Sequence, residues 1–117
     1  MKYILLIYLD EAWDKLSLAE RQRVYEDQLQ LSLELSANGQ YLGGNPLHSP
    51  STATSVRVRD GKRLLTDGPF AETREHLGGY MMIDVENLDE AIAIAARSPL
   101  ASVGTIEVRP VREGPPR

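Results

Sequence analysis

Several short apolar stretches of the chain have the β-branched and aromatic content that is typical of strands. Tyr3 to Tyr8 is uninterrupted and predicts a buried central strand, and Tyr80 to Val85 predicts a second, mostly apolar strand. Gln40 to Leu42 predicts a short strand that ends at a pair of glycines. Thr105 to Val111 predicts the last strand, and Pro110 marks an edge or a strand end because proline cannot donate a ladder hydrogen bond.

Two capping-box motifs predict where the helices begin. The residues SLAE at 17–20 predict a helix from about Leu18, which Asn38-Gly39 ends after Ala37. NLDE at 87–90 predicts a second helix, which Ser98-Pro99 ends after about Arg97. A polar connection is expected over residues 10–16, before the first helix. One stripe of the first helix predicts its buried face: Val24, Gln28, Leu31 and Leu35. Gln28 therefore lies near the middle of an otherwise apolar face.

A β-hairpin is predicted between the two halves of the chain. Ala53 to Arg59 alternates apolar with polar residues, Asp60-Gly61 is a preferred hairpin turn, and Lys62 to Thr66 returns as the second strand. With this hairpin inserted, the order β-α-β, β-α-β predicts an α+β, ferredoxin-like (split βαβ) fold with both helices on one sheet face. We expect one domain over residues 1–112 and a flexible C-terminal tail over residues 113–117.

The second face of such a sheet is left without a helix, although both central strands carry apolar residues on it. Exposed apolar patches of this kind mark interaction surfaces. A second copy of the same chain, packed sheet against sheet with two-fold symmetry, is the most economical cover. The sequence therefore predicts a homodimer through the sheet face.

The composition excludes several classes of function. The chain has 117 residues, 42% hydrophobic and 26% charged, which is ordinary for one globular domain. A net charge of −4 without a run of Lys or Arg argues against a nucleic-acid partner. The lack of cysteine excludes disulfides and thiolate catalysis and fits a cytoplasmic protein. The N-terminal apolar run is shorter than the roughly 20 residues of a membrane span, so no membrane partner is expected.

A long and specific motif fills the second half of the chain, TDGPFAETREHLGGYMMIDVENLDEAIAIAARSP, continued by GTIEVRPV. Together with KYILLIYLDEA at the start and STATSVRVRDGK in the middle, it resembles the DGPF branch of the YCII-related superfamily. The resemblance implies the dimeric α/β-barrel version of the ferredoxin-like fold, and it implies no settled activity. Some DGPF proteins are encoded beside extracytoplasmic-function sigma factors, and one YCII-related relative is similar to a dehydrochlorinase that acts on a chlorinated, hydroxylated ring.

The same resemblance implies a histidine–aspartate pair for the YCII branch. At the matching positions this chain has Gln28 and Ser98. Glutamine has no titratable nitrogen and cannot serve as a general base near neutral pH, and a serine cannot orient and charge-stabilise an imidazole as an aspartate does. The acid–base pair is therefore missing, which argues against an activity that depends on it.

Four residues are candidate ligand contacts: Gln28, Asp67, Phe70 and Tyr80. Gln28 either makes a structural hydrogen bond on the buried face or grips a ligand with its amide donor and acceptor. Asp67 either caps its own turn or forms part of a cleft wall. We expect Phe70 to bury its ring as an anchor and Tyr80 to direct its hydroxyl into a shared pocket.

Asp67 and His76 are the two candidates for a catalytic role. The charged residues from Glu72 to Glu75 precede His76, and this cluster fits either a solvated loop or a site that binds a carboxylate and titrates. The two histidines, His48 and His76, lack the spacing of metal ligands, and no phosphate-binding loop is present. We expect neither a metal nor a cofactor.

Three functions are compatible with these observations. The first is a dimeric small-molecule-binding protein or divergent enzyme, with a cleft between the first helix, the sheet and the DGPF turn. The second is a regulatory protein that partners an extracytoplasmic-function sigma factor. The third is a lyase or hydrolase on hydroxylated aromatic compounds that uses Asp67 or His76 in place of the missing pair.

Overall fold

The computed structural model describes residues 1–71 and 73–114 and forms two antiparallel sheets with helices on one side. The elements in chain order are β1 (Lys2–Leu9), α1 (Glu11–Asp14), α2 (Leu18–Ala37), β2 (Tyr41–Pro46), β3 (Thr54–Arg59), β4 (Lys62–Asp67), β5 (His76–Asp84), α3 (Leu88–Arg97) and β6 (Gly104–Pro110). The main sheet has the strand order β2-β5-β1-β6, and β3 pairs only with β4. This mixed α+β arrangement is consistent with the predicted ferredoxin-like fold.

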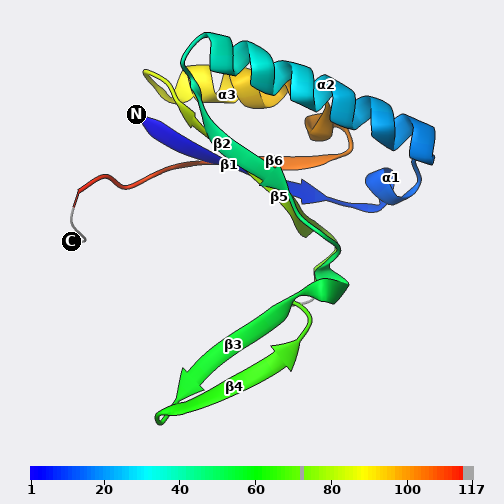
Figure 1. The fold of residues 1–117 in the computed structure, drawn as a ribbon, viewed down its shortest axis with the longest axis vertical. Coiled ribbons are helices and arrows are strands. Elements are labelled where there is room, and N and C mark those ends of the chain that lie inside the picture. Colours follow the sequence, from blue (N-terminus) through cyan, green and yellow to red (C-terminus); the bar gives the residue numbers. More distant parts are fainter. Residues whose placement is uncertain (72, 115–117) are drawn as a thin grey trace.

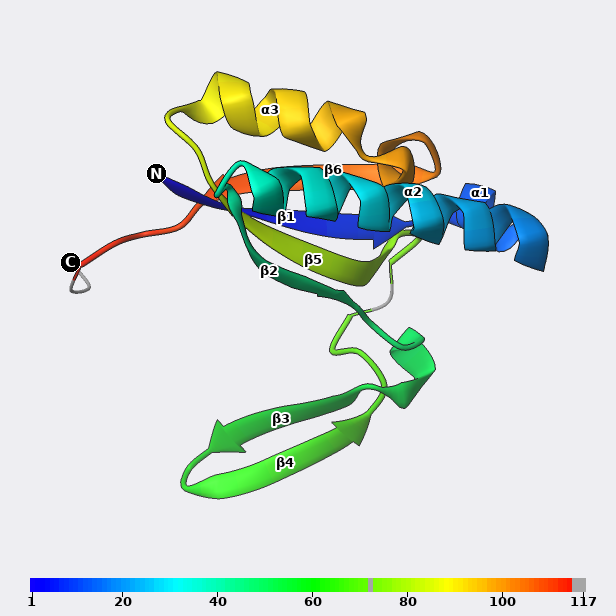
Figure 2. The same cartoon turned by 45° about the horizontal axis from the view of Figure 1, so that its top comes forward.

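Helices α2 and α3 lie side by side on one face of the main sheet (Figure 2). Strand β1 alternates strictly between buried and half-buried side chains, because every second residue points towards the helices. The three largest fully buried side chains lie between the helices and the sheet: Leu5, Leu35 and Ile83. In the part of the chain that the structure describes, no helix covers the opposite face of the sheet.

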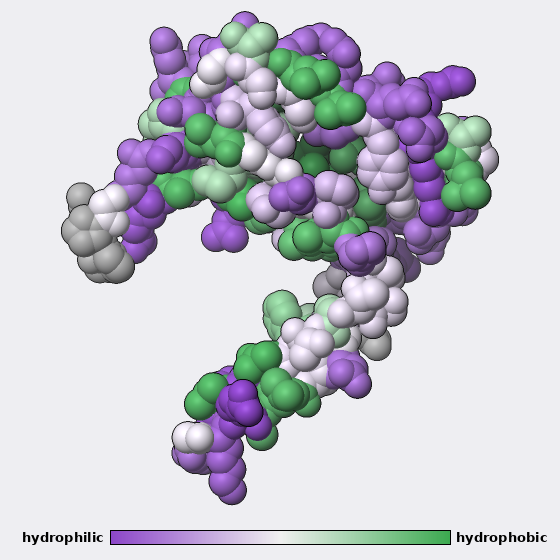
Figure 3. Space-filling view, viewed as in Figure 1, coloured by the Kyte–Doolittle hydropathy of each residue, from purple (hydrophilic) through white to green (hydrophobic). Residues whose placement is uncertain are grey.

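The hairpin of β3 and β4, called the arm below (residues 54–67), extends away from the main sheet (Figure 1). It lies on the side of the sheet that carries no helix (Figure 2). Its turn has positive φ angles of 51° at Asp60 and 74° at Gly61, which suit the right-handed twist of paired strands. Apolar side chains gather along the arm (Figure 3), and four are exposed: Val56, Val58, Leu64 and Leu65. A two-stranded hairpin of this kind is marginally stable in water by itself. Packing of its apolar side chains against another surface would stabilise it.

Three elements differ from the prediction. Residues 10–16 were predicted as a polar connection, but Asp10 caps the short helix α1, which buries Trp13 against the core. Strand β2 does not end at the glycine pair but continues to Pro46, since an edge strand tolerates glycine and proline. Strand β5 begins at His76 rather than at Tyr80, because its first residues pair with the end of β1.

Candidate functional site

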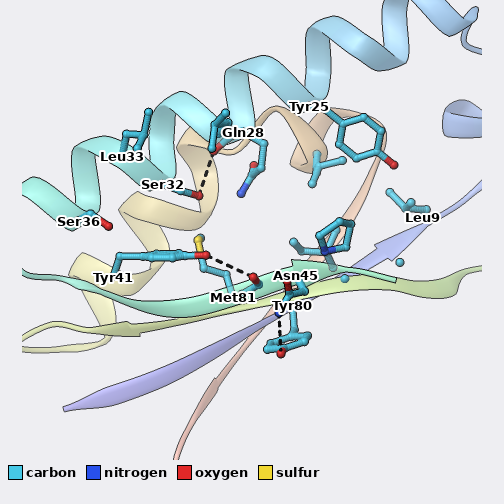
Figure 4. Close-up of a pocket in the computed structure, with 17 residues that line it drawn as sticks. Leu9, Tyr25, Gln28, Ser32, Leu33, Ser36, Tyr41, Asn45, Tyr80 and Met81 are labelled. Carbon is cyan, nitrogen blue, oxygen red and sulfur yellow. Dashed lines mark hydrogen bonds between the residues drawn. The ribbon is translucent and has the colours of Figure 1, made fainter. Parts of the chain in front are cut away.

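A cavity of about 390 Å³ lies between α2 and the strands β2 and β5 (Figure 4). Helix α2 supplies one wall with residues that repeat every three or four positions: Tyr25, Gln28, Leu29, Ser32, Leu33 and Ser36. This spacing places them on one face of the helix. The floor and the ends come from three strands and the turn after α3: Ile7, Leu9, Tyr41, Gly44, Asn45, Pro46, Gly78, Gly79, Tyr80, Met81 and Leu100. The volume falls within the usual range for small-molecule sites.

Glycines in the floor explain why the cavity exists. Gly44 in β2 and Gly78 and Gly79 in β5 place no side chain under α2. A Cβ atom on Gly44 would lie 2.6 Å from the Tyr80 carbonyl oxygen, and one on Gly78 would lie 2.5 Å from Leu9 Cδ1. Any larger residue at these two positions would force the sheet or its side chains to move. Gly44, Gly78 and Gly79 therefore form a flat floor.

Gln28 and Ser98 are hydrogen-bonded to each other. The Ser98 hydroxyl donates to Gln28 Oε1 at 2.6 Å and accepts the backbone N–H of Leu100 at 3.2 Å. Ser98 is 3% exposed, and its position at the end of α3 brings it under the middle of α2. The two positions that the resemblance matches to a histidine–aspartate pair are thus paired in space in this chain, as an amide and a hydroxyl.

The amide nitrogen of Gln28 points into the cavity (Figure 4). The other polar side chains near it make local hydrogen bonds. Ser32 donates to the Gln28 carbonyl oxygen at 3.1 Å, and the Tyr41 hydroxyl donates to the Gly44 carbonyl oxygen at 3.5 Å. Neither contact uses Gln28 Nε2, so this nitrogen is a donor that the wall of α2 presents to a ligand, together with the hydroxyls of Tyr25 and Ser36.

Tyr80 lines the cavity through its backbone only. Its ring lies on the face of the strands away from α2 (Figure 4), in register with Leu6 of β1. There the Tyr80 hydroxyl accepts a hydrogen bond from Asn45 Nδ2 at 3.3 Å. The expectation that this hydroxyl enters the pocket is therefore wrong for the single chain, because the strand alternation sends the ring to the bare face.

Electrostatically the cavity is neutral. Among the residues that the structure describes, none of the side chains that line it belongs to Asp, Glu, Lys, Arg or His. A shifted pKa occurs instead in the capping box of α2. The pKa of the Glu20 carboxyl is lowered chiefly by the hydrogen bond from the Ser17 backbone N–H, with the Ser17 side chain and Arg23 adding to the effect. The cavity is therefore built for binding by shape and hydrogen bonds, without an acid–base group.

The structure separates the other predicted site residues from this cavity. Asp67 is exposed at the end of β4, and Phe70 is 80% exposed, so the expected burial of its ring is wrong for the single chain. His76 is half-buried at the start of β5 opposite Leu9 and does not line the cavity. Glu72 of the charged cluster lies outside the described residues, as do residues 115–117 of the predicted tail.

The turn that follows Asp67 closes the base of the arm. Gly68 has a φ angle of 93°, which favours glycine, and its N–H donates to the Ala53 carbonyl oxygen at 2.7 Å. Ser55 donates its hydroxyl to the Gly68 carbonyl oxygen at 2.9 Å. In the single chain these contacts give the DGPF motif a structural role.

Sequence reasoning missed most of the helix wall. Ser32 and Ser36 stand four and eight residues after Gln28, so all three lie on the same side of α2 and line the cavity. Tyr25 and Leu29 add the outer rim. The signal that identifies these residues is the repeat of small polar side chains along the stripe that already contained Gln28.

Residues 1–71 and 73–114 hold no group of three or more His, Asp or Glu that is placed to bind a metal ion. Over the same residues, none of the helices has the length and apolar character needed to cross a bilayer.

Comparison with known proteins places this chain in a family. The model of the YCII-related domain matches residues 1–114, and the chain belongs to that family. It is 38% identical over 118 residues to an uncharacterised protein of Rhizobium meliloti (strain 1021), covering 95% of this chain and 92% of that protein.

Among solved structures, the chain is similar to 5-chloro-2-hydroxyhydroquinone dehydrochlorinase from Burkholderia phenoliruptrix AC1100 in complex with 2,5-dihydroxybenzoquinone. The TM-score is 0.59 and the sequence identity 16%, over 97% of this chain and 96% of that chain. This likeness concerns the fold.

Proposed function

We propose that this protein binds a small, mainly apolar molecule in the cavity beneath α2. The observation that carries the proposal is the Gln28 amide, held by Ser98 and aimed into a cavity of about 390 Å³. The missing acid–base pair makes binding, or a divergent chemistry, a better match than an activity that depends on that pair. The TDGPFAETRE motif supports placement in the DGPF branch, and the absence of cysteine supports a cytoplasmic location. Cell fractionation that recovers the protein outside the cytoplasm would contradict that location.

A thermal-shift screen tests the binding proposal. A ligand present at 100 times its dissociation constant stabilises the folded state by about 2.7 kcal/mol, which raises the melting temperature by roughly 10 °C for a domain of this size. We expect shifts with neutral single-ring compounds. The Ser32→Phe variant, which fills the cavity, should lose them, whereas Ser102→Phe at an exposed position outside it should keep them. Equal shifts in both variants would place the ligand elsewhere.

The same proposal includes a homodimer through the bare sheet face, which gives the dimeric α/β barrel. Supporting it are apolar residues that pair across β1 and β5 on that face, Ile4 with Met82 and Leu6 with Tyr80. The exposed apolar side chains of the arm lie on the same side of the sheet and add a second surface for the partner copy. The molar mass in solution tests this, as developed in the Discussion.

A lyase acting on hydroxylated aromatic compounds is the second candidate. The name of the solved neighbour and the position of the cavity in a shared fold favour it. Elimination of HCl requires a base, and Gln28 cannot be one. Asp67 or His76 of one copy would have to reach the cavity of the second copy, because neither residue lines the cavity of its own chain. Turnover of a chlorinated hydroquinone that the Asp67→Asn and His76→Gln variants both retain in full would rule out this version of the enzyme.

A sigma-factor partner stays a prediction from the resemblance. The exposed arm is the surface that we expect such a partner to contact, since it carries both apolar and basic side chains. Affinity purification from native cells that yields the same proteins with and without the arm would contradict it.

A further inference from the structure

We infer that the cavity selects an uncharged ligand that accepts a hydrogen bond, such as an aromatic ketone, and that Gln28 Nε2 is the donor that recognises it. This inference rests on the proposed binding function and specifies the chemical class of the ligand. Three observations carry it: the fixed orientation of the amide, the neutral lining and the flat glycine floor.

Ser98 fixes which end of the Gln28 amide meets the ligand. A serine hydroxyl has one proton, and one lone pair of Ser98 Oγ already accepts the N–H of Leu100. Its proton therefore needs an acceptor, and Gln28 Oε1 lies 2.6 Å away. A rotated amide would turn an N–H donor towards the hydroxyl, and the hydroxyl proton would lose its acceptor, which is costly at a site that is 3% exposed. Ser98 is thus a positioning residue, and Gln28 Nε2 faces the cavity as a donor.

The lining then decides the charge of the ligand. A carboxylate or phenolate bound here would lose part of its hydration and find no cationic side chain among the described residues of the wall. An ammonium group would find no carboxylate. A neutral acceptor loses far less on leaving water, and the hydrogen bond from Gln28 replaces the one that water supplied.

The floor decides the shape. Gly44, Gly78 and Gly79 present backbone without side chains, while Leu29, Leu33 and Met81 supply apolar contacts around it. A flat ring lies against such a floor more closely than a branched aliphatic group does. The ligand class is therefore a planar, mainly apolar molecule with one neutral acceptor at its edge.

Three probes of similar size separate these features. Acetophenone has the neutral carbonyl, α-methylstyrene replaces that oxygen with a methylene group, and benzoate carries a charge. Titrations monitored by ¹H–¹⁵N NMR give the dissociation constants. They also follow the Gln28 side-chain amide, which is assigned by its loss in Gln28→Met. We expect acetophenone to bind about 3- to 10-fold more tightly than α-methylstyrene, to bind more tightly than benzoate, and to shift the Gln28 amide signal.

Variants test the positioning role. Gln28→Met and Ser98→Ala should each remove the preference for acetophenone while leaving the affinity for α-methylstyrene similar. Ser98→Thr, which keeps the hydroxyl, should restore the preference, and Gln30→Met, on an exposed side of α2, should not change it. A variant that merely loosened the fold would bind both acetophenone and α-methylstyrene more weakly, and its melting temperature would fall as well.

The outcomes separate this inference from the proposed function. If acetophenone and α-methylstyrene bind equally in the cavity and the Gln28 signal does not move, the binding function stands and the acceptor recognition is wrong. Tighter binding of benzoate overturns the inferred neutrality of the ligand. If none of the three probes perturbs any residue of the cavity, both the inference and the proposed function fail.

Discussion

A single aspartate in place of Leu6 is expected to convert the proposed homodimer into monomers. Leu6 lies on the bare face of the sheet beside Tyr80, at the centre of the apolar surface that we propose as the interface. Two-fold symmetry places the new carboxylate in the interface twice, where each one loses water without gaining a partner. An uncompensated buried charge costs about 3–5 kcal/mol, so the dimer dissociation constant should rise by roughly a hundredfold or more.

Light scattering coupled to size-exclusion chromatography measures this change as a halved molar mass. Ile92→Asp is the matched control, because Ile92 is exposed on α3, on the helix side of the molecule. It introduces the same charge and should leave the dimer intact. Circular dichroism verifies that the Leu6→Asp chain keeps its fold. A wild-type chain that is already monomeric at micromolar concentration would contradict the proposed dimer. A Leu6→Asp variant that stays dimeric would contradict the sheet face as its interface.

The charge and the apolar surface of the arm independently support the proposed dimer. Its strands carry Arg57, Arg59, Lys62 and Arg63 against Asp60 and Asp67, so it is basic on a chain whose net charge is −4. A basic arm with exposed leucines and valines is complementary to the acidic body of a second copy, both in charge and in apolar surface. Its projection on the bare-face side puts both features where a partner copy would lie.

Local signals predicted the helices accurately. The two capping motifs mark the starts of Leu18–Ala37 and Leu88–Arg97, and Asn38-Gly39 and Ser98-Pro99 mark their ends, because a helix end is decided by residues within one turn of it. The stripe on α2 was also correct for Leu31 and Leu35, which are buried. Helical periodicity depends on neighbours three and four residues away, and the sequence displays those directly.

Features that depend on distant partners were not predictable. Strand β2 continues through Gly44 to Pro46 only because β5 pairs with it, and nothing local marks glycine and proline as strand residues. The orientation of the Gln28 amide depends on Ser98, 70 residues further along the chain. The resemblance named both positions as a pair, but it did not reveal that they would be hydrogen-bonded as an amide and a hydroxyl. The burial expected for Phe70 requires a surface that one chain does not supply.

The largest loss of folding stability is expected on truncation of Leu35, which packs in the main core between α2 and the sheet. Leu35→Ala is expected to destabilise the fold by about 2–5 kcal/mol, because Leu35 is 1% exposed and its side chain fills the space between α2 and the sheet. Removing it loses the transfer free energy of the deleted groups and leaves a cavity that the rigid sheet closes only in part. The melting temperature should fall by roughly 10–20 °C.

Leu33→Ala is the matched control on the same helix, since Leu33 is 56% exposed and loses little contact on truncation. Its effect should stay within about 0.5 kcal/mol, as for other exposed positions. Both variants are compared by urea denaturation at one protein concentration, because the proposed dimerisation would make the apparent stability depend on concentration. Equal losses in the two variants would mean that α2 packs on the sheet through a different face, and the cavity wall built from Gln28, Ser32 and Ser36 would then be misplaced as well.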